Sequence, residues 1–419
     1  MANRLTIYIV IALVLGLLTG WAMHEAIKTS APATAAVLKD ATQIFPILTT
    51  IFLRLIKMII APLVFSTLII GIAHMSDSSA LGRVGLRALT WFIGASLVSL
   101  TLGLIQVHLL QPGAGLALAL PPVSEASGVD KAAFNLKDFV THIVPASIVE
   151  ALAKNEIIQI VVFSVFAGVA ITSLGERAAP LVRGAEALAE VMLKVTNYVM
   201  ALAPVAVFAA VANSLAERGP EVIGNLGYFM ASFYLALMLL WTVLIAIGGL
   251  FLGRDVVPLV RAIRAPLLLA FSTASSEAAY PKTLEALEKY GVPPRIASFM
   301  LPLGYSFNLD GSMMYMTFAS LFIAQAYGIQ LTLSAQITML LVLMVTSKGI
   351  AGVPRASLVV VAATLPLFGI PEAGLLLILA VDQFLDMGRS ATNVVGNAVA
   401  TAVIARWESG RPARAEAVG

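Results

Sequence analysis

Long apolar segments occupy most of the first 253 residues, and they restrict the chain to one class of fold. About 20 consecutive apolar residues suffice to cross a bilayer as a helix. Six such runs occur, at about 5–25, 43–74, 84–111, 137–174 (broken in the middle), 182–215 and 222–253. With 59% hydrophobic and only 12% charged residues, the chain is expected to be an all-α polytopic membrane protein. Prolines within or beside these runs should bend or break them, at Pro46, Pro62, Pro145 and Pro204.

Basic residues predict the orientation. If the six runs alternate across the membrane, most Arg side chains between them fall on one side, which the positive-inside rule makes cytoplasmic: Arg4, Arg83, Arg87, Arg177, Arg183, Arg254, Arg261, Arg264, Arg406, Arg411 and Arg414. Both termini are then expected in the cytoplasm. The run 5–25 lacks a small-residue cleavage site, so we interpret it as a spanning helix and not as a removed signal peptide.

Simple alternation fails after residue 255. The run 258–271 is too short to cross, meets the polar tip 272–277 and returns as an amphipathic segment. The run 337–345 is likewise short, meets the tip 346–354 and returns as an apolar segment. Interrupted segments at matching places in two halves of a chain indicate a transporter site near the bilayer midplane. Two ordinary interfacial loops are the alternative, which the matched layout disfavours.

The helix expected at about 295–325 carries polar residues in mid-membrane. Asn308, Asp310 and Gly311 lie together there, which predicts a locally unwound helix whose carbonyls could coordinate a cation or accept a proton-bearing group. A packing kink at Gly304 and Gly311 is the simpler interpretation, but Asp310 in the same turn argues against it.

A polar stripe runs along residues 382–397, which read DQFLDMGRSATNVVGN. At about 100° per residue, its charged and amide side chains fall within roughly an 80° arc of one helix: Asp382, Asp386, Arg389, Asn393 and Asn397. A guanidinium matches a carboxylate and an Asp can hold an ammonium, so the stripe favours a small zwitterion with an extra carboxylate. A buried ion pair or polar seam between helices is the alternative, although ionisable groups inside a membrane are usually functional.

Composition excludes several other chemistries. There is no Cys, so thiolate catalysis and Cys-based metal sites are excluded, and the four His are scattered with no HExxH-like set. No metal centre or cofactor is expected, and the net charge of +3 gives no nucleic-acid signal. An intramembrane aspartyl protease would also place two Asp in the bilayer, but Asp310 and Asp386 lack its flanking motif and Arg389 would serve no purpose there. We therefore expect no enzyme; a channel would be distinguished by unitary currents in place of saturable uptake.

Four motifs together resemble the dicarboxylate/amino acid:cation symporters, the family of glutamate and aspartate transporters, over essentially the whole chain. They are Ser275-Ser276, the segment 308–312 (NLDGS), the segment 351–354 (AGVP), and the segment 386–389 (DMGR) followed by Asn393. The resemblance implies eight transmembrane helices, two re-entrant helical hairpins, inverted repeats, an elevator mechanism and a homotrimer among membrane lipids in the bacterial inner membrane. It divides the chain into a scaffold (1–81 and 137–221), a transport domain (82–111 and 222–407), an extracellular loop (112–136) and a cytoplasmic tail (408–419).

The resemblance also implies roles for site residues. In family members the Arg of the last helix holds the substrate side-chain carboxylate, the Asp one turn earlier holds the amino group, and an Asn lies one turn later; these correspond to Arg389, Asp386 and Asn393. The hairpin tips and the interrupted helix would complete the site with Ser275, Ser276, Gly352, Val353 and Ser312, where Thr is common.

Departures from the sodium-coupled members bear on the driving ion. Asn397 stands where those members have Asp, Phe92 and Ala95 replace two hydroxyl ligands while Ser96 is kept, Lys348 adds a cation to the second tip, and Glu277 lies in the first. These changes resemble the proton-coupled bacterial branch. Burial can raise a carboxyl pKa toward the working pH, so Glu277 is the first candidate proton carrier, followed by Asp310 and Asp382. Asn308, Asn397 and Lys348 complete the coupling set, and a Glu277–Lys348 ion pair is the simpler interpretation of those two charges.

The sequence thus favours a secondary active symporter that imports glutamate or aspartate with protons. A C4-dicarboxylate:proton symporter and a sodium-coupled aspartate/glutamate symporter remain alternatives. Asp386 favours an amino acid, because a second carboxylate would repel a substrate without an ammonium. A neutral amino acid would leave the Arg389 charge without a partner in a medium of low dielectric constant.

Overall fold

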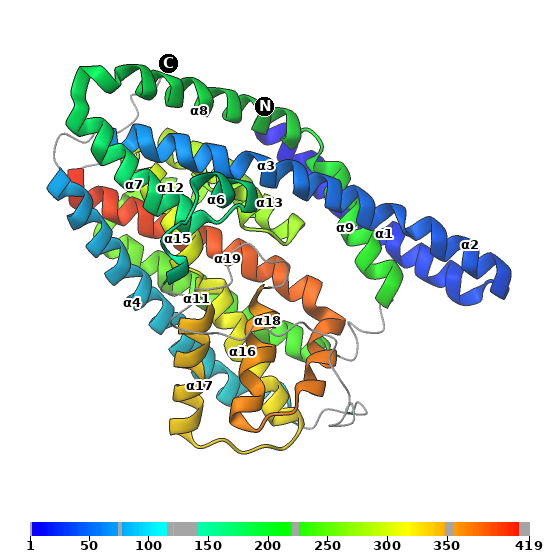
Figure 1. Ribbon diagram of the computed structural model, residues 1–419. Coiled ribbons are helices and arrows are strands. Elements are labelled where there is room, and N and C mark those ends of the chain that lie inside the picture. Colours follow the sequence, from blue (N-terminus) through cyan, green and yellow to red (C-terminus); the bar gives the residue numbers. More distant parts are fainter. Residues whose placement is uncertain are drawn as a thin grey trace.

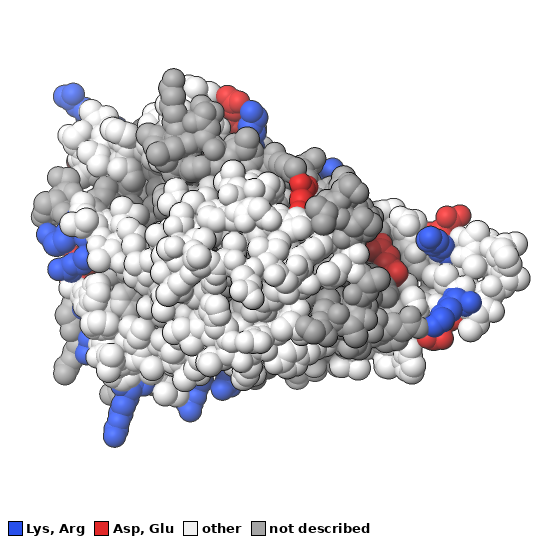
Figure 2. Space-filling view, turned by 90° about the horizontal axis from the view of Figure 1, so that it is seen from below, with Lys and Arg blue, Asp and Glu red and all other residues white. Residues whose placement is uncertain are grey.

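The computed structural model describes residues 2–73, 78–114, 120, 141–219, 226–347 and 356–409. Over these ranges all regular secondary structure is helical, as the sequence predicts. By length and composition, five described segments could cross a membrane: Ile7–Thr29, Pro32–Ala73, Gly82–Leu110, Ile157–Met200 and Gly227–Ala262. In Figure 2 the charged side chains lie mainly at the margins of the face shown, and the surface between them is largely uncharged. Over the described residues the protein is therefore helical, with several apolar helices.

One set of helices packs around α3 and α1 in the upper part of Figure 1. Its members are α1 (Ala2–Thr29), α2 (Pro32–Thr42), α3 (Ile44–Ala73), α6 (Ile148–Lys154), α7 (Ile157–Leu174), the 3-10 turn η1 (Gly175–Ala178), α8 (Ala179–Met200) and α9 (Ala203–Arg218). The α1–α9 contact is close: a Cβ on Gly20 would lie 2.6 Å from the carbonyl oxygen of Ala212. Small residues permit such approach between apolar helices.

The remaining helices surround α19 (Leu375–Ser409), which packs against α4, α11, α13, α15 and α16. They are α4 (Ser78–Leu110), α11 (Gly227–Leu252), η2 (Gly253–Asp255), α12 (Val256–Ala262), α13 (Arg264–Thr273), η3 (Glu277–Ala279), α14 (Tyr280–Tyr290), α15 (Pro294–Phe307), α16 (Asp310–Ala326), α17 (Leu333–Thr346), α18 (Ala356–Thr364), η5 (Leu365–Phe368) and η6 (Glu372–Gly374). The helix carrying the polar stripe is thus covered on several sides.

The prolines act differently from one another. The run 182–215, expected as one long span, is divided into α8 and α9, with Pro204 in the first turn of α9. Proline lacks the N–H that a continuing helix would need, so Pro204 breaks the run, as predicted. Pro62 lies inside α3, which continues past it, so Pro62 does not break its run. The Ser66 hydroxyl donates to the Pro62 carbonyl oxygen at 2.7 Å.

Both predicted irregularities of the second half are present. The first short run is a helix pair, α13 and α14, joined through Ala274, whose φ of 51° is left-handed. The second pair is α17 and α18, and its tip lies outside the described residues. The helix expected at 295–325 is interrupted at Asn308 and Leu309, between α15 and α16. The predicted unwinding at this point is therefore confirmed.

Charged contacts join three helix ends. Arg87 Nη1 donates to Glu408 Oε1 at 2.5 Å, and Arg83 lies 3.5 Å from the same carboxylate. Arg406 Nη1 lies 3.8 Å from Asp255. The start of α4 and the ends of α11 and α19 therefore meet at one end of the molecule, as alternation of the apolar runs requires.

Candidate substrate site

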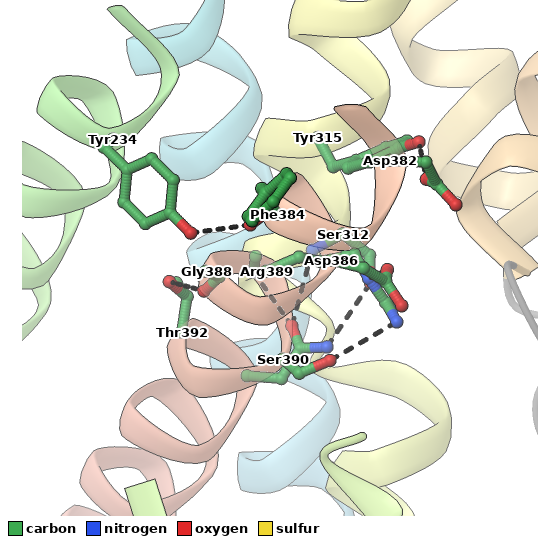
Figure 3. Close-up of polar contacts among 12 residues, drawn as sticks. Tyr234, Ser312, Tyr315, Asp382, Phe384, Asp386, Gly388, Arg389, Ser390 and Thr392 are labelled. Atoms are coloured by element: carbon green, nitrogen blue, oxygen red, sulfur yellow. Dashed lines mark hydrogen bonds and ion pairs between the residues drawn. The ribbon is translucent and has the colours of Figure 1, made fainter. Parts of the chain in front are cut away.

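The centre of the polar stripe is an ion pair within one turn of α19. Arg389 Nε donates to Asp386 Oδ1, and each of the two side chains is only 12% exposed. Arg389 Nη1 also donates to Ser312 Oγ on α16 at 3.0 Å, and Nη2 reaches Ser390 Oγ at 3.4 Å. Figure 3 shows these groups on the side of α19 that faces α16. The structure thus brings together Arg389, Asp386 and Ser312 as the sequence predicted.

Asn393 joins α19 to the start of α16. Its Oδ1 accepts from the backbone N–H of Gly311 at 2.9 Å and of Ser312 at 3.4 Å. These N–H groups belong to the first turn of α16, where no intrahelical acceptor is available. A side-chain oxygen in this position is an N-terminal cap supplied from another helix. Asn393 therefore has a structural role that the stripe alone did not reveal.

Hydrogen-bond inventories show what these groups could still bind. Of the five N–H groups of a guanidinium, three are used in the contacts above, so two N–H groups of Arg389 make no bond to the described residues and could bind a ligand carboxylate. The Ser312 oxygen accepts from both Arg389 and Asn393, the latter at 3.3 Å, which leaves its O–H proton to donate. Among the described residues, only one oxygen of Asp386 accepts a side-chain hydrogen bond, so the second oxygen could bind an ammonium. The arrangement can hold a carboxylate and an ammonium side by side.

Asp382 lies one turn before Asp386 and is bound differently. The Tyr315 hydroxyl, on α16, donates to Asp382 Oδ1 at 2.5 Å, and both side chains are buried (Figure 3). Because this carboxylate is engaged by a phenol of the neighbouring helix, Asp382 serves at least to hold α16 against α19. Sequence reasoning missed Tyr315; its position one turn after Gly311 on the interrupted helix was the available signal.

The remaining coupling candidates gather where α15, α16, α19 and α4 meet. A Cβ on Gly304 would lie 2.1 Å from the Asn397 amide oxygen and 3.6 Å from the Phe92 ring, and a Cβ on Gly396 would lie 1.9 Å from the Asp310 carboxylate. Ser99 donates to Asp310 Oδ1 at 3.5 Å. The buried amides of Asn308 and Asn397 form no hydrogen bond within the described part of the chain. Asn308, Asp310 and Asn397 therefore lie close together, whereas Asp382, another member of the predicted coupling set, binds Tyr315.

The first hairpin tip lies beside α19, because α13 packs along that helix. Its hydroxyls make local contacts: Ser275 Oγ accepts from the Ala278 N–H at 3.2 Å, and Ser276 is buried. Glu277 begins η3 and is half-buried. The second-tip candidates Lys348, Gly352 and Val353 lie outside the described residues.

The profile of the sodium:dicarboxylate symporter family matches residues 5–407, a range that includes the interrupted helix, the helix pairs and the charged last helix. The chain belongs to the sodium:dicarboxylate symporter family. It is 41% identical over 408 residues to the proton/glutamate-aspartate symporter of Escherichia coli (strain K12), covering 96% of this chain and 92% of the relative. It is 39% identical over 406 residues to the proton/sodium-glutamate symport protein of Bacillus caldotenax, covering 96% and 93%. It is 42% identical over 363 residues to a C4-dicarboxylate transport protein of Rhizobium johnstonii, covering 85% and 82%.

Membership of this symporter family confirms the resemblance carried by the four motifs. Relatives named for amino acids and for C4-dicarboxylates are about equally similar to this chain. Overall identity therefore does not choose between these substrates, and the choice rests on individual side chains such as Asp386.

Proposed function

We propose that the protein is a secondary active symporter that imports glutamate or aspartate together with protons. The observation that carries this proposal is the Arg389–Asp386 ion pair within one turn of α19. Arg389 can bind a carboxylate, and Asp386 can bind an ammonium. Relatives named for glutamate and aspartate transport support it.

When the substrate binds, the Arg389 guanidinium and the Asp386 carboxylate would each have a substrate group of opposite charge beside them. The side-chain carboxylate of the substrate would take the two N–H groups of Arg389 that remain available, and the ammonium would take the second oxygen of Asp386. Charge-assisted bonds of this kind are the strong ones in a dry site. Ser312 would donate to a substrate carboxylate while it keeps Arg389 in place. The tip residues Ser275, Ser276, Gly352 and Val353, with the amide nitrogen of Asn393, would close around the substrate.

Protons are the proposed coupling ion. A sodium site needs several oxygens at fixed distances and commonly a carboxylate, whereas this chain has the neutral Asn397 next to the apolar Phe92 ring. A proton needs only one carboxylate that becomes alternately accessible and closed. Glu277, at the first tip, is the proposed carrier, and Asp310 and Asp382 are the alternatives. Lys348 would further disfavour a metal cation in the second tip.

The proposed mechanism is an elevator movement in a homotrimer. Residues 1–81 and 137–221 would be the scaffold, and residues 82–111 and 222–407 the transport domain, with eight transmembrane helices and two re-entrant hairpins. The extensive packing of α1 with α9, of α3 with α7 and α8, and of α11 and α16 with α19 supports this division, and α13 and α15 form the contact between the two sets. The loop 112–136 would be extracellular, and both termini, with the tail 408–419, would lie on the cytoplasmic side of the bacterial inner membrane.

A C4-dicarboxylate:proton symporter is the second candidate, because a relative with 42% identity carries that name. The test is uptake of labelled glutamate, aspartate and succinate into proteoliposomes, with pH and sodium gradients imposed separately. We expect uptake of the amino acids to follow an inward proton gradient without sodium, and Glu277→Gln to lose the pH dependence. A sodium requirement at constant pH would refute proton coupling, and preferential succinate uptake would support the second candidate.

A further inference from the structure

The face of α19 opposite the substrate site is held by α11 through two side-chain hydrogen bonds. The Tyr234 hydroxyl donates to the Phe384 carbonyl oxygen at 2.6 Å. Trp241 Nε1 donates to Thr392 Oγ1 at 2.7 Å, and the Thr392 hydroxyl in turn donates to the Gly388 carbonyl oxygen at 2.8 Å. Figure 3 shows Tyr234 and Thr392 on one side of α19 and Ser312 and Asp386 on the other.

Helix geometry explains this separation. At about 100° per residue, positions 384, 388 and 392 fall within roughly 80° of one another, and their centre lies about 140° from the centre of the polar stripe. The contacted carbonyls, of Phe384 and Gly388, flank Asp386 and belong to the turns that present Asp386 and Arg389. A shift of either carbonyl would therefore move the ion pair.

Gly388 lets α11 come this close. A Cβ at position 388 would lie 2.7 Å from Leu237 Cδ1 and 3.0 Å from Tyr234 Cε1. A methyl group there would push Tyr234 away from the carbonyl that it binds. These residues of α11 and α19 thus form one contact. We call it the back-face anchor (Tyr234, Trp241, Gly388 and Thr392).

We propose that the back-face anchor positions the substrate site: Tyr234 and Trp241 set the rotation and height of α19 that place Arg389 and Asp386 opposite Ser312. The two are positioning residues, because they touch the backbone and Thr392 and not the ligand groups. The Arg389–Ser312 bond, at 3.0 Å, spans two helices and tolerates little displacement. This inference rests on the proposed function, whose ligand groups it serves.

The test compares two tyrosines of the same helix. Tyr228, also on α11, donates to the Leu110 carbonyl oxygen at 2.6 Å, so Tyr228→Phe removes a bond of the same kind and length that does not involve α19, from a tyrosine that is more exposed than Tyr234, and it is the control. In the full-length protein, we expect Tyr234→Phe and Trp241→Phe to weaken glutamate binding about fivefold, from the loss of one hydrogen bond. The Tyr234→Phe and Trp241→Phe variants should also prefer glutamate over succinate less strongly than the wild type does. Tyr228→Phe should change neither the affinity for glutamate nor this preference.

A double-mutant cycle separates positioning from general loosening of the protein. If Tyr234 acts through the Arg389–Ser312 geometry, Tyr234→Phe should have a clearly smaller effect in a Ser312→Ala background than in the wild type. Gly388→Ala should reproduce the loss of affinity. Additive effects in the cycle, or a Tyr234→Phe variant that binds like Tyr228→Phe, would overturn the inference. Failure of the wild type to bind glutamate or aspartate would instead overturn the proposed function, and the same cycle with succinate would still decide the positioning role.

Discussion

Arg389 and Asp386 neutralise each other across one turn of α19, in a site where both side chains are almost fully buried. Two buried opposite charges are tolerated when they are paired and hydrogen-bonded, and removal of one leaves the other uncompensated. The structure therefore keeps the charges needed for an acidic zwitterion ready without exposing a single buried charge. This relationship determines the first two predictions.

Arg389→Ala should abolish binding of acidic substrates. Truncation of one partner of a buried, hydrogen-bonded charge pair costs about 2–5 kcal/mol, which is roughly 30-fold or more in affinity. Glutamate and aspartate binding would be measured by calorimetry on purified protein. Arg87→Ala is the control, because Arg87 pairs with Glu408 at the far end of α19. Unchanged affinity in Arg389→Ala would contradict the assigned role.

Asp386→Asn should change substrate selectivity, and it should also destabilise the protein because it leaves the buried Arg389 charge uncompensated. The amide keeps the shape but removes the charge that holds an ammonium and repels a second carboxylate, so glutamate binding should weaken by about 10- to 100-fold. Succinate or malate should gain in relative preference. Competition assays measure the glutamate-to-succinate ratio, and a ratio equal to that of the wild type would exclude a role of Asp386 in recognising the amino group.

Ser312→Ala should weaken substrate binding, because Ser312 Oγ accepts from both Arg389 and Asn393. Loss of a hydrogen bond to a charged group costs about 1.5–3 kcal/mol, or roughly 10- to 150-fold. Ser312→Thr should retain most of the affinity. Ser320→Ala is the control: Ser320 is buried on the same helix and makes no hydrogen bond with other described residues. Equal affinities of Ser312→Ala and Ser320→Ala would be evidence against this bond.

Two glutamates of α14, which lies outside the candidate spans, should affect stability in opposite directions. Burial raises the pKa of Glu288, and the negative charge of Glu285 adds to it. Burial also acts to raise the pKa of Glu285, but hydrogen bonds from Lys282 and Lys289 outweigh it and hold that pKa below its ordinary value.

The signs follow from proton linkage. The stability that Glu288 contributes is complete below its unfolded-state pKa and is lost as the pH rises through its folded-state pKa. The stability that Glu285 contributes is present above its unfolded-state pKa and is lost as the pH falls through its folded-state pKa. At neutral pH, Glu288→Gln should therefore raise the thermal unfolding temperature and Glu285→Gln should lower it. Unfolding scans over a pH series measure both, and shifts of the same sign would refute the assignment.

The sequence predicted the interruption of the helix at Asn308 and the common face of Asp386, Arg389 and Asn393. Both depend on local rules: unfavourable polar backbone in an apolar run, and the 3.6-residue period of a helix. The break at Pro204 was predicted for the same kind of reason, because proline cannot donate to the preceding turn. The helix α3 continues through Pro62, which shows the limit of such a rule.

The sequence by itself thus determined the class of protein, the helix pairs of the second half and the stripe of ligand groups, because apolar length and helical period are properties of neighbouring residues. Only the tertiary structure decided that Asn393 caps α16, that Tyr315 binds Asp382 and that Tyr234 and Trp241 hold the back of α19. The Tyr315–Asp382 bond joins residues 67 positions apart, and the Trp241–Thr392 bond joins residues 151 positions apart. Which donor meets which acceptor over such separations depends on how the helices pack, and a single sequence carries no local signal for it.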